Sequence, residues 1–226
     1  CAGAAAASGA GYIILAGRDP GEGPPDAIVR KCVTSREALA ALLEDDRIGA
    51  VVIGPGLGRG SDAGDWIDAA LACEHPLVID GDALSLLGTS AAERISRRGA
   101  ATFLTPHSGE FGRMFAAGDT GKIVRTVQAA EASGATILHK GADTVIAAPD
   151  GHAVLATDAP TWLSTAGTGD VLAGILAARI AAGAASPLHA AGAAVWLHGR
   201  AAHYCGPAFH ADRLIDALPI AIADCL

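Results

Sequence analysis

Short apolar segments recur along this chain, and most of them end in a loop of glycine and polar residues. Five such loops cover residues 54–60, 80–82, 105–110, 139–142 and 165–170. Segments with apolar residues at helical spacing lie between several of them, for example 35–46 and 62–73. Strands that alternate with helices through short connections predict a parallel sheet covered by helices on both faces. Ligands of such sheets bind outside the carboxyl ends of the strands, where we expect the five loops.

The individual segments predict the order of the elements. We expect strands within residues 11–17, 50–58, 76–84, 100–115 and 135–141, of which the first is expected to be buried. We expect helices over residues 35–46, 62–73, 126–134, 171–183, 187–205 and 212–226, and a further helix after the strand and loop of residues 100–115. Residues 143–157 contain a Pro-Asp-Gly turn between two apolar runs and predict a β-hairpin. Because no repeat or linker interrupts the pattern, we expect one α/β domain over residues 1–226.

Composition and charge narrow the function classes. Hydrophobic residues make up 51% of the 226 residues, enough for a large core. The formal net charge of −8 argues against non-specific nucleic-acid binding but leaves phosphorylated small molecules open. The five cysteines show no CxxC spacing, which indicates reduced thiols. No apolar run reaches the roughly 18 residues of a membrane span and no secretory leader is visible, so we expect a cytoplasmic protein.

The beginning of the sequence is unusual. Residue 1 is Cys, and the only methionine is Met114. Residues 1–8 resemble the end of a helix, so we expect the natural chain to begin earlier.

The sequence TAGTGD at residues 165–170 is the strongest sign of chemistry. Gly167, Thr168 and Gly169 let neighbouring backbone N–H groups point the same way, and the positive end of the following helix adds to them. Such a turn can hold a phosphoryl group. Asp170 lies in the first helical turn, where its carboxylate stays ionised and can accept a proton from an attacking hydroxyl. An ordinary turn before an N-terminal helix acid is the alternative. Gly174, further along this helix, predicts a close backbone neighbour.

The loop GPGLGRG at residues 54–60 lacks the GxGxxG order of a dinucleotide-binding loop. Its Gly56 and Gly58 nevertheless leave room for a ligand against the backbone, unless the loop is a plain turn. Asp80 and Asp82 follow the next strand and could bind Mg²⁺ or accept hydrogen bonds from ribose hydroxyls. Capping of a helix is the alternative for Asp82.

Two further loops carry candidate polar side chains. His107 could hydrogen-bond a substrate amide or a phosphate, and Glu110 could hold a water bound to a metal ion. Both residues could equally serve the structure alone. Lys140 follows a predicted strand and could neutralise nucleotide phosphates, although a solvated lysine is the common alternative.

Together, five segments resemble the ADP/ATP-dependent NAD(P)H-hydrate dehydratases, a family with a ribokinase-like fold. In chain order they are GPGLGRG, LVIDGDAL, LTPHSGEFGRM, LHKGADTVIAAPDG and STAGTGDVLAGILA. The C-terminal LIDALPIAIADCL is similar to the usual ending of that family, so the likeness covers nearly all of residues 1–226. Ser108 departs from the family pattern, which has proline there. The resemblance implies a three-layer α/β/α sandwich whose mostly parallel sheet ends in a C-terminal hairpin. It also implies one further strand before residue 1, and hence an N-terminally truncated domain.

The resemblance implies a repair reaction on the hydrated cofactors (S)-NADHX and NADPHX. The hydroxyl at C6 of the nicotinamide ring is phosphorylated from ADP or ATP with Mg²⁺, and phosphate then leaves. Asp170 would be the base, assisted by Gly167, Thr168 and Gly169, and Glu110 is a candidate for holding the metal. By the same likeness, the substrate would contact Gly56, Gly58, His107 and Asp170, and we expect Asp82 to join these contacts through ribose hydroxyls. The adenine nucleotide would contact Lys140, Gly141, Ala142, Asp143, Thr144 and Gly169.

Partners and rival functions complete the expectations. We expect a homo-oligomer that works with a separate NAD(P)HX epimerase. The nearest rival is a ribokinase-like kinase for a vitamin precursor such as a hydroxymethylpyrimidine, thiazole or pyridoxal alcohol. A non-catalytic adenine-nucleotide-binding protein is the rival from another class, although a mere binder has no need of Asp170.

Overall fold

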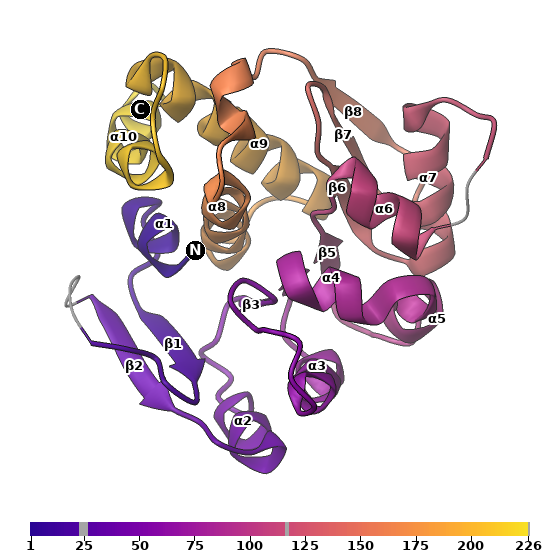
Figure 1. Ribbon diagram of the computed structural model, residues 1–226, viewed down its shortest axis with the longest axis vertical. Coiled ribbons are helices and arrows are strands. Elements are labelled where there is room, and N and C mark those ends of the chain that lie inside the picture. Colours follow the sequence, from indigo (N-terminus) through magenta and orange to yellow (C-terminus); the bar gives the residue numbers. More distant parts are fainter. Residues whose placement is uncertain (23–26, 116–117, 226) are drawn as a thin grey trace.

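The computed structural model describes residues 1–22, 27–115 and 118–225, and it places a central sheet between two layers of helices (Figure 1). The strands are β1 (Ile13–Gly17), β2 (Ile28–Cys32), β3 (Val51–Ile53), β4 (Leu77–Ile79), β5 (Thr102–Leu104), β6 (Thr136–His139), β7 (Thr144–Ala147) and β8 (Ala153–Ala156). The α-helices are α1 (Ala2–Ala7), α2 (Arg36–Leu42), α3 (Ala63–Ala72), α4 (Gly81–Leu87), α5 (Ala91–Ile95), α6 (Ser108–Met114), α7 (Lys122–Ser133), α8 (Thr168–Ala181), α9 (Pro187–Cys205) and α10 (Ala211–Ala223). Two short 3₁₀ helices, η1 (Gly88–Ser90) and η2 (Thr161–Ser164), complete the described elements.

The larger sheet runs in the order β3-β4-β5-β6-β7-β8. Strands β3 to β6 are parallel, whereas β7 and β8 form the predicted antiparallel hairpin, in which Thr144 pairs with Ala156. Because the four parallel strands end at the same edge, the loops that follow them meet there. The predictions of a mostly parallel sheet and of a hairpin at residues 143–157 are therefore confirmed.

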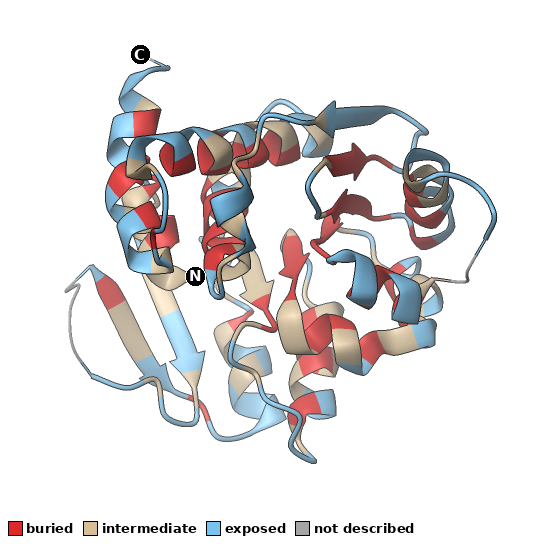
Figure 2. Cartoon of the chain, turned by 45° about the horizontal axis from the view of Figure 1, so that its top comes forward, coloured by how far each residue is buried: buried red, intermediate tan, exposed pale blue. Residues whose placement is uncertain are grey.

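Alternate side chains of the buried strands pack against opposite helical layers. Val78 of β4 belongs to the core beneath α8, α9 and α10, whereas its neighbours Leu77 and Ile79 belong to the core beneath α3 to α7. Strands β4 to β7 are buried in full, and Figure 2 shows them as a red band inside the molecule. Strand β8 lies at the edge of the sheet and is mostly exposed. Within the described residues, no helix combines the length and apolarity that crossing a membrane requires.

Helix α8 is packed on most sides and positions the loop before it. Residues 171–178 are all buried. A Cβ atom added at Gly174 would lie 2.3 Å from the carbonyl oxygen of Cys1, so the predicted close backbone neighbour is confirmed. Tight packing fixes the helix axis and, with it, the position of residues 167–170.

Some element predictions were wrong. The run at residues 11–17 was expected to form a buried strand, but β1 is only half-buried and pairs in parallel with β2, outside the larger sheet (Figure 2). Strand β2 was not predicted. The predicted strand at residues 76–84 ends at Ile79, because Gly81 adopts φ +54° and begins α4. Helix α7 begins at Lys122, four residues before its predicted start at residue 126.

Candidate functional site

The start of α8 carries the predicted anion-binding turn. Gly167 is the N-cap and adopts φ +86°, a conformation that glycine reaches without steric cost. In the described part of the chain, the backbone N–H groups of Gly167, Gly169 and Asp170 donate to no other group. The side chain of Asp170 is partly exposed. The turn therefore offers free donors and an accessible carboxylate at the positive end of a helix.

Thr168 supports this turn from within. Its amide donates to the carbonyl oxygen of Thr165 at 3.3 Å, and its hydroxyl lies 2.7 Å from the carbonyl oxygen of Leu163. Its side chain is buried. These bonds leave neither donor for a ligand, so Thr168 shapes the turn, and the free amides are those of its neighbours.

His198 of α9 supports the same turn, and sequence reasoning missed it. Its Nε2 lies 2.9 Å from the carbonyl oxygen of Thr168. Because a carbonyl oxygen can only accept, Nε2 must carry the proton in this hydrogen bond. Burial lowers the pKa of His198 to about 4, so the ring is neutral at physiological pH. A polar residue on the otherwise apolar face of α9 was the available signal.

Lys140 reaches the start of α8 from the end of β6. Its Nζ is 3.0 Å from Oδ1 of Asp80, whose side chain is only 3% exposed. A Cβ atom added at Gly169 would lie 3.2 Å from this Nζ and 4.0 Å from Oδ2 of Asp80. The ammonium group is thus held beside Gly169, and its contact with nucleotide phosphates stays a prediction.

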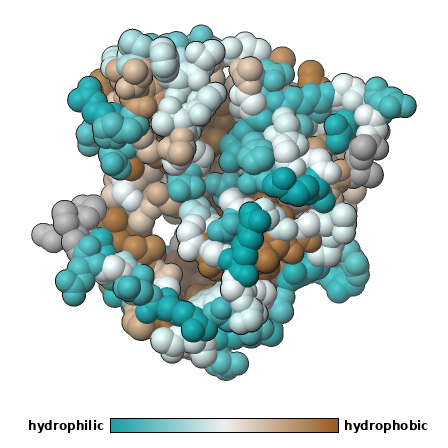
Figure 3. Space-filling model, viewed as in Figure 1, coloured by the Kyte–Doolittle hydropathy of each residue, from teal (hydrophilic) through white to brown (hydrophobic). Residues whose placement is uncertain are grey.

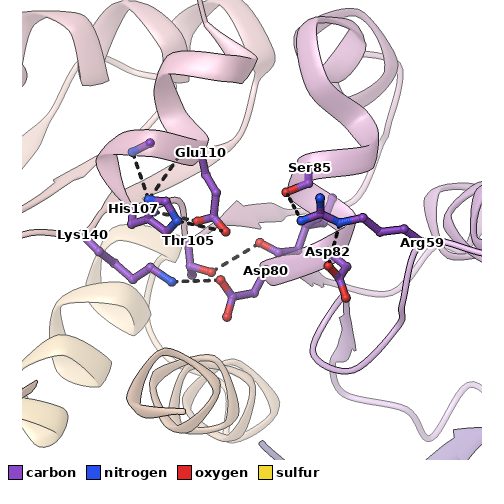
Figure 4. A network of polar contacts seen from close by, with 10 residues as sticks. Arg59, Asp80, Asp82, Ser85, Thr105, His107, Glu110 and Lys140 are labelled. Carbon is purple, nitrogen blue, oxygen red and sulfur yellow. Dashed lines mark hydrogen bonds and ion pairs between the residues drawn. The ribbon is translucent and has the colours of Figure 1, made fainter. Parts of the chain in front are cut away.

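The glycine-rich loop after β3 lies on the other side of Asp80. Gly56 and Gly58 have positive φ angles and open space where a Cβ would stand. Asp82 holds this loop, because its carboxylate accepts from the N–H of Gly58 at 3.0 Å and from Nε of Arg59 at 3.1 Å (Figure 4). In the space-filling view the face is hollowed beside this loop (Figure 3).

His107 begins α6 and is exposed toward the same edge of the sheet. Its ring Nδ1 accepts from the backbone N–H of Gly109 at 2.9 Å, while the backbone N–H of His107 donates to Oε2 of Glu110 at 2.9 Å. This reciprocal arrangement is a capping box. The Nδ1 bond places the proton of a neutral His107 on Nε2, and this nitrogen lies 3.6 Å from Oε1 of Glu110.

The capping box accounts for the buried position of the Glu110 carboxylate. Its side chain is 10% exposed, and one of its oxygens is used by the backbone of His107. No group of three or more His, Cys, Asp or Glu side chains that could hold a metal ion occurs in residues 1–22, 27–115 and 118–225. The proposed metal role of Glu110 therefore finds no supporting ligand cluster.

A second buried histidine joins the starts of α6 and α7 to the end of β6. Nδ1 of His139 is 3.0 Å from Oγ1 of Thr126, and Nε2 is 3.2 Å from Oγ of Ser108. Since the Thr126 hydroxyl donates to the carbonyl oxygen of Lys122, Nδ1 must be the donor in the first bond. Burial, assisted by the charge of Lys122, lowers the pKa of His139 to about 4. The neutral ring therefore links α6 and α7 to β6 directly before Lys140.

The remaining nucleotide candidates form the loop between β6 and β7. Gly141 and Ala142 are exposed, whereas Thr144 is buried as the first residue of β7. Nζ of Lys122 is 3.0 Å from Oδ1 of Asp143, and this bond lowers the pKa of Asp143. The loop is thus fixed from α7, and its exposed part faces outward next to Lys140.

A family model and two curated proteins match this chain in sequence. A family model described as NAD(P)H-hydrate dehydratase matches residues 1–219. The bifunctional NAD(P)H-hydrate repair enzyme Nnr of Salinibacter ruber is 40% identical over 199 residues, which are 83% of this chain and 36% of that protein. The ADP-dependent (S)-NAD(P)H-hydrate dehydratase of Neisseria meningitidis is 38% identical over 175 residues, 72% of this chain and 57% of that protein.

The fold has solved counterparts as well. The structure of a ribokinase-like superfamily protein from Enterococcus faecalis superposes with a TM-score of 0.84 at 24% identity, and covers 99% of this chain and 80% of that one. The ribokinase-like fold is therefore confirmed. The chain spans between a third and three fifths of the length of the two curated relatives described above. Because the family model covers almost the whole sequence, the chain belongs to the NAD(P)H-hydrate dehydratase family.

Proposed function

We propose that this chain catalyses the ADP-dependent dehydration of (S)-NADHX and NADPHX to NADH and NADPH. The observation that carries the proposal is the start of α8, where the free amides and the partly exposed Asp170 belong to one turn and Nζ of Lys140 lies beside Gly169. The name of the Neisseria meningitidis relative supports ADP as the phosphoryl donor, with ATP as the alternative.

The reaction begins with phosphoryl transfer. The C6 hydroxyl oxygen of the hydrated nicotinamide attacks the terminal phosphorus of ADP, Asp170 takes the hydroxyl proton, and the bond to the leaving AMP breaks. The amides of Gly167, Gly169 and Asp170 stabilise the charge of the transferring group. Lys140 neutralises phosphate charge on the nucleotide side.

Elimination then restores the reduced cofactor. The lone pair of the ring nitrogen expels phosphate from C6, and a proton leaves C5 to give the C5–C6 double bond. One NADHX and one ADP thus yield one NADH, one AMP and one phosphate. Phosphorylation turns a poor leaving group into a good one, and this accounts for a base beside an anion-binding turn.

The substrate side is assigned by position. The backbone at Gly56 and Gly58 meets open space, and His107 is exposed at the same edge of the sheet. We assign these groups to the hydrated nicotinamide nucleotide. The exposed residues 141–142 would border the adenine nucleotide.

Mg²⁺ fits this site only when it binds together with the nucleotide. Mg²⁺ commonly uses one or two carboxylates together with substrate phosphates and water. Asp80, which lies near the turn, already pairs with Lys140. The ion would therefore be held mainly by the nucleotide phosphates and water, and it would shield phosphate charge when bound.

A single assay tests the proposal. Purified protein receives hydrated NADH, ADP and Mg²⁺, and dihydronicotinamide absorbance and AMP are measured together. Equal amounts of NADH and AMP are expected. Phosphorylation of a hydroxymethylpyrimidine, thiazole or pyridoxal alcohol with no NADH formed would favour the kinase, and ADP binding without turnover would favour the non-catalytic binder. An NAD(P)HX epimerase added to the assay should let both epimers of the substrate be consumed.

A further inference from the structure

Asp80, Gly81 and Asp82, here called the DGD segment, connect the two sides of the site. Asp80 turns toward Lys140 and the start of α8, with 3.0 Å between Oδ1 and Nζ. Asp82 turns the other way, toward the loop after β3, where it binds the N–H of Gly58 at 3.0 Å. Figure 4 shows the two carboxylates pointing to different partners.

Gly81 makes this divergence possible. Its φ of +54° belongs to the left-handed region, which residues other than glycine adopt only with strain. The segment also packs tightly against the glycine-rich loop, since a Cβ added at Gly54 would lie 1.7 Å from the carbonyl oxygen of Asp80. The positions of both carboxylates are therefore fixed by the backbone.

Both carboxylates are already occupied by protein groups. The buried charge of Asp80 is stable only while it is paired, and Lys140 supplies the pair. The two oxygens of Asp82 accept from Gly58 and from Arg59, which also lies 3.3 Å from Oγ of Ser85. These bonds explain the position of Asp82 without the substrate contact that the sequence predicts.

We infer that the DGD segment is a positioning element for phosphoryl transfer, with one carboxylate assigned to each side of the site. Asp80 holds the ammonium of Lys140 against Gly169, where the phosphoryl group is received. Asp82 holds residues 56–59 in the shape that receives the hydrated nicotinamide nucleotide. This inference rests on the proposed function and adds residues that act through others.

Steady-state kinetics of two variants separate the roles. Asp80→Asn should lower kcat by about 30-fold and leave the KM for hydrated NADH within about 2-fold, because its effect lies in the transition state. Asp82→Asn should raise that KM by about 10-fold with little change in kcat, because it loosens a binding loop. Asp46→Asn, an exposed aspartate after α2, is the matched control and should change neither value.

Double-mutant cycles identify the partners. The effects of Asp80→Asn and Lys140→Met on the kinetic constants should be strongly non-additive, and so should the effects of Asp82→Asn and Arg59→Met. The effects of the cross pair, Asp80→Asn and Arg59→Met, should be additive. If Asp80→Asn alone does not fold, the Asp80→Asn/Lys140→Met double variant should, because it leaves no unpaired buried charge.

Calorimetric ADP binding keeps this test separate from the proposed function. Lys140→Met should weaken ADP binding more in the wild-type protein than in Asp80→Asn, whether or not turnover occurs. Absence of turnover in the wild type with this coupling intact would contradict only the proposed function. Equal kinetic defects in both variants, strong coupling of the cross pair, or a tenfold higher Mg²⁺ requirement in Asp80→Asn would overturn the inference.

Discussion

The two sides of the site differ in how firmly their polar groups are held. On the nucleotide side, the side chains of Asp80 and Lys140 are 3% and 20% exposed and are paired with each other. On the substrate side, the side chains of His107 and Arg59 are 57% and 65% exposed, and the glycine loop faces open space. Under the proposed function, the phosphoryl group would lie on the firmly held side and the dinucleotide on the open side. The firmly held groups would then lie where charge develops during the reaction.

Replacement of Asp170 should have the largest effect, because this residue acts where the two sides meet. Asp170→Asn removes the base but keeps the size of the side chain and the free amides. We expect kcat to fall on the order of 10³-fold, while ADP binding measured by calorimetry changes little. Near-normal turnover in this variant would show that another group accepts the proton.

The glycine loop offers a sharp contrast between its inner and outer faces. Gly54→Ala places a Cβ 1.7 Å from the carbonyl oxygen of Asp80, whereas Gly56→Ala meets open space at φ +68°. We expect the first change to lower the free energy of unfolding by at least about 3 kcal/mol and the second by about 1 kcal/mol. Urea unfolding measures both. Similar losses of unfolding free energy in the two variants would mean that the loop does not pack tightly against the DGD segment.

The buried histidines of the fixed side should make the stability of the protein sensitive to acid. The folded pKa of His198 is lowered to about 4 from 6.5, so the unfolded state binds its proton first as the pH falls. Stability is therefore complete above pH 6.5 and is lost progressively down to about pH 4. At pH 5 the loss from His198 should be about 2 kcal/mol, and His139 acts in the same direction.

Urea unfolding at two pH values tests this statement. His198→Gln can still donate to Thr168 but carries no titrating group, so it should lose less stability than the wild type between pH 7.5 and pH 5. His152→Gln, a change on an exposed loop, should behave like the wild type. An unchanged pH dependence in His198→Gln would contradict the neutral buried ring.

The capping box on the open side should give the smallest effect. Glu110→Ala removes the acceptor for the N–H of His107 and should cost about 1 kcal/mol of stability. Glu110→Gln keeps an acceptor oxygen and should cost less. If Glu110→Gln instead raised the Mg²⁺ concentration needed for turnover, the metal role first considered for Glu110 would be restored.

Local patterns predicted most of the sheet and the loops at its edge. Short apolar runs that end in loops of glycine and polar residues identified β3 to β6, and the Pro-Asp-Gly turn identified the hairpin of β7 and β8. The helix start at residues 165–170 was also visible, because glycines before an acid and an apolar run are a local signal. These features depend on neighbours in sequence.

Contacts between distant residues could not be predicted in this way. The pair of Asp80 with Lys140 joins residues 60 positions apart, and the bond from His198 to Thr168 spans 30 positions. The half-exposed setting of β1 depends on which strands pair with it, and the apolar sequence of β1 does not reveal that. Thr168 was grouped with its neighbours because sequence does not show which amides are already used.

Isotope transfer tests the central claim most directly. Hydrated NADH prepared in ¹⁸O-water carries the label in its C6 hydroxyl, and the protein is then supplied with this substrate, ADP and Mg²⁺ in ordinary water. If the hydroxyl oxygen attacks phosphorus beside Asp170, every phosphate released should contain one ¹⁸O atom and should equal the NADH formed. Unlabelled phosphate, with the ¹⁸O recovered in water, would contradict phosphorylation of the substrate at this site.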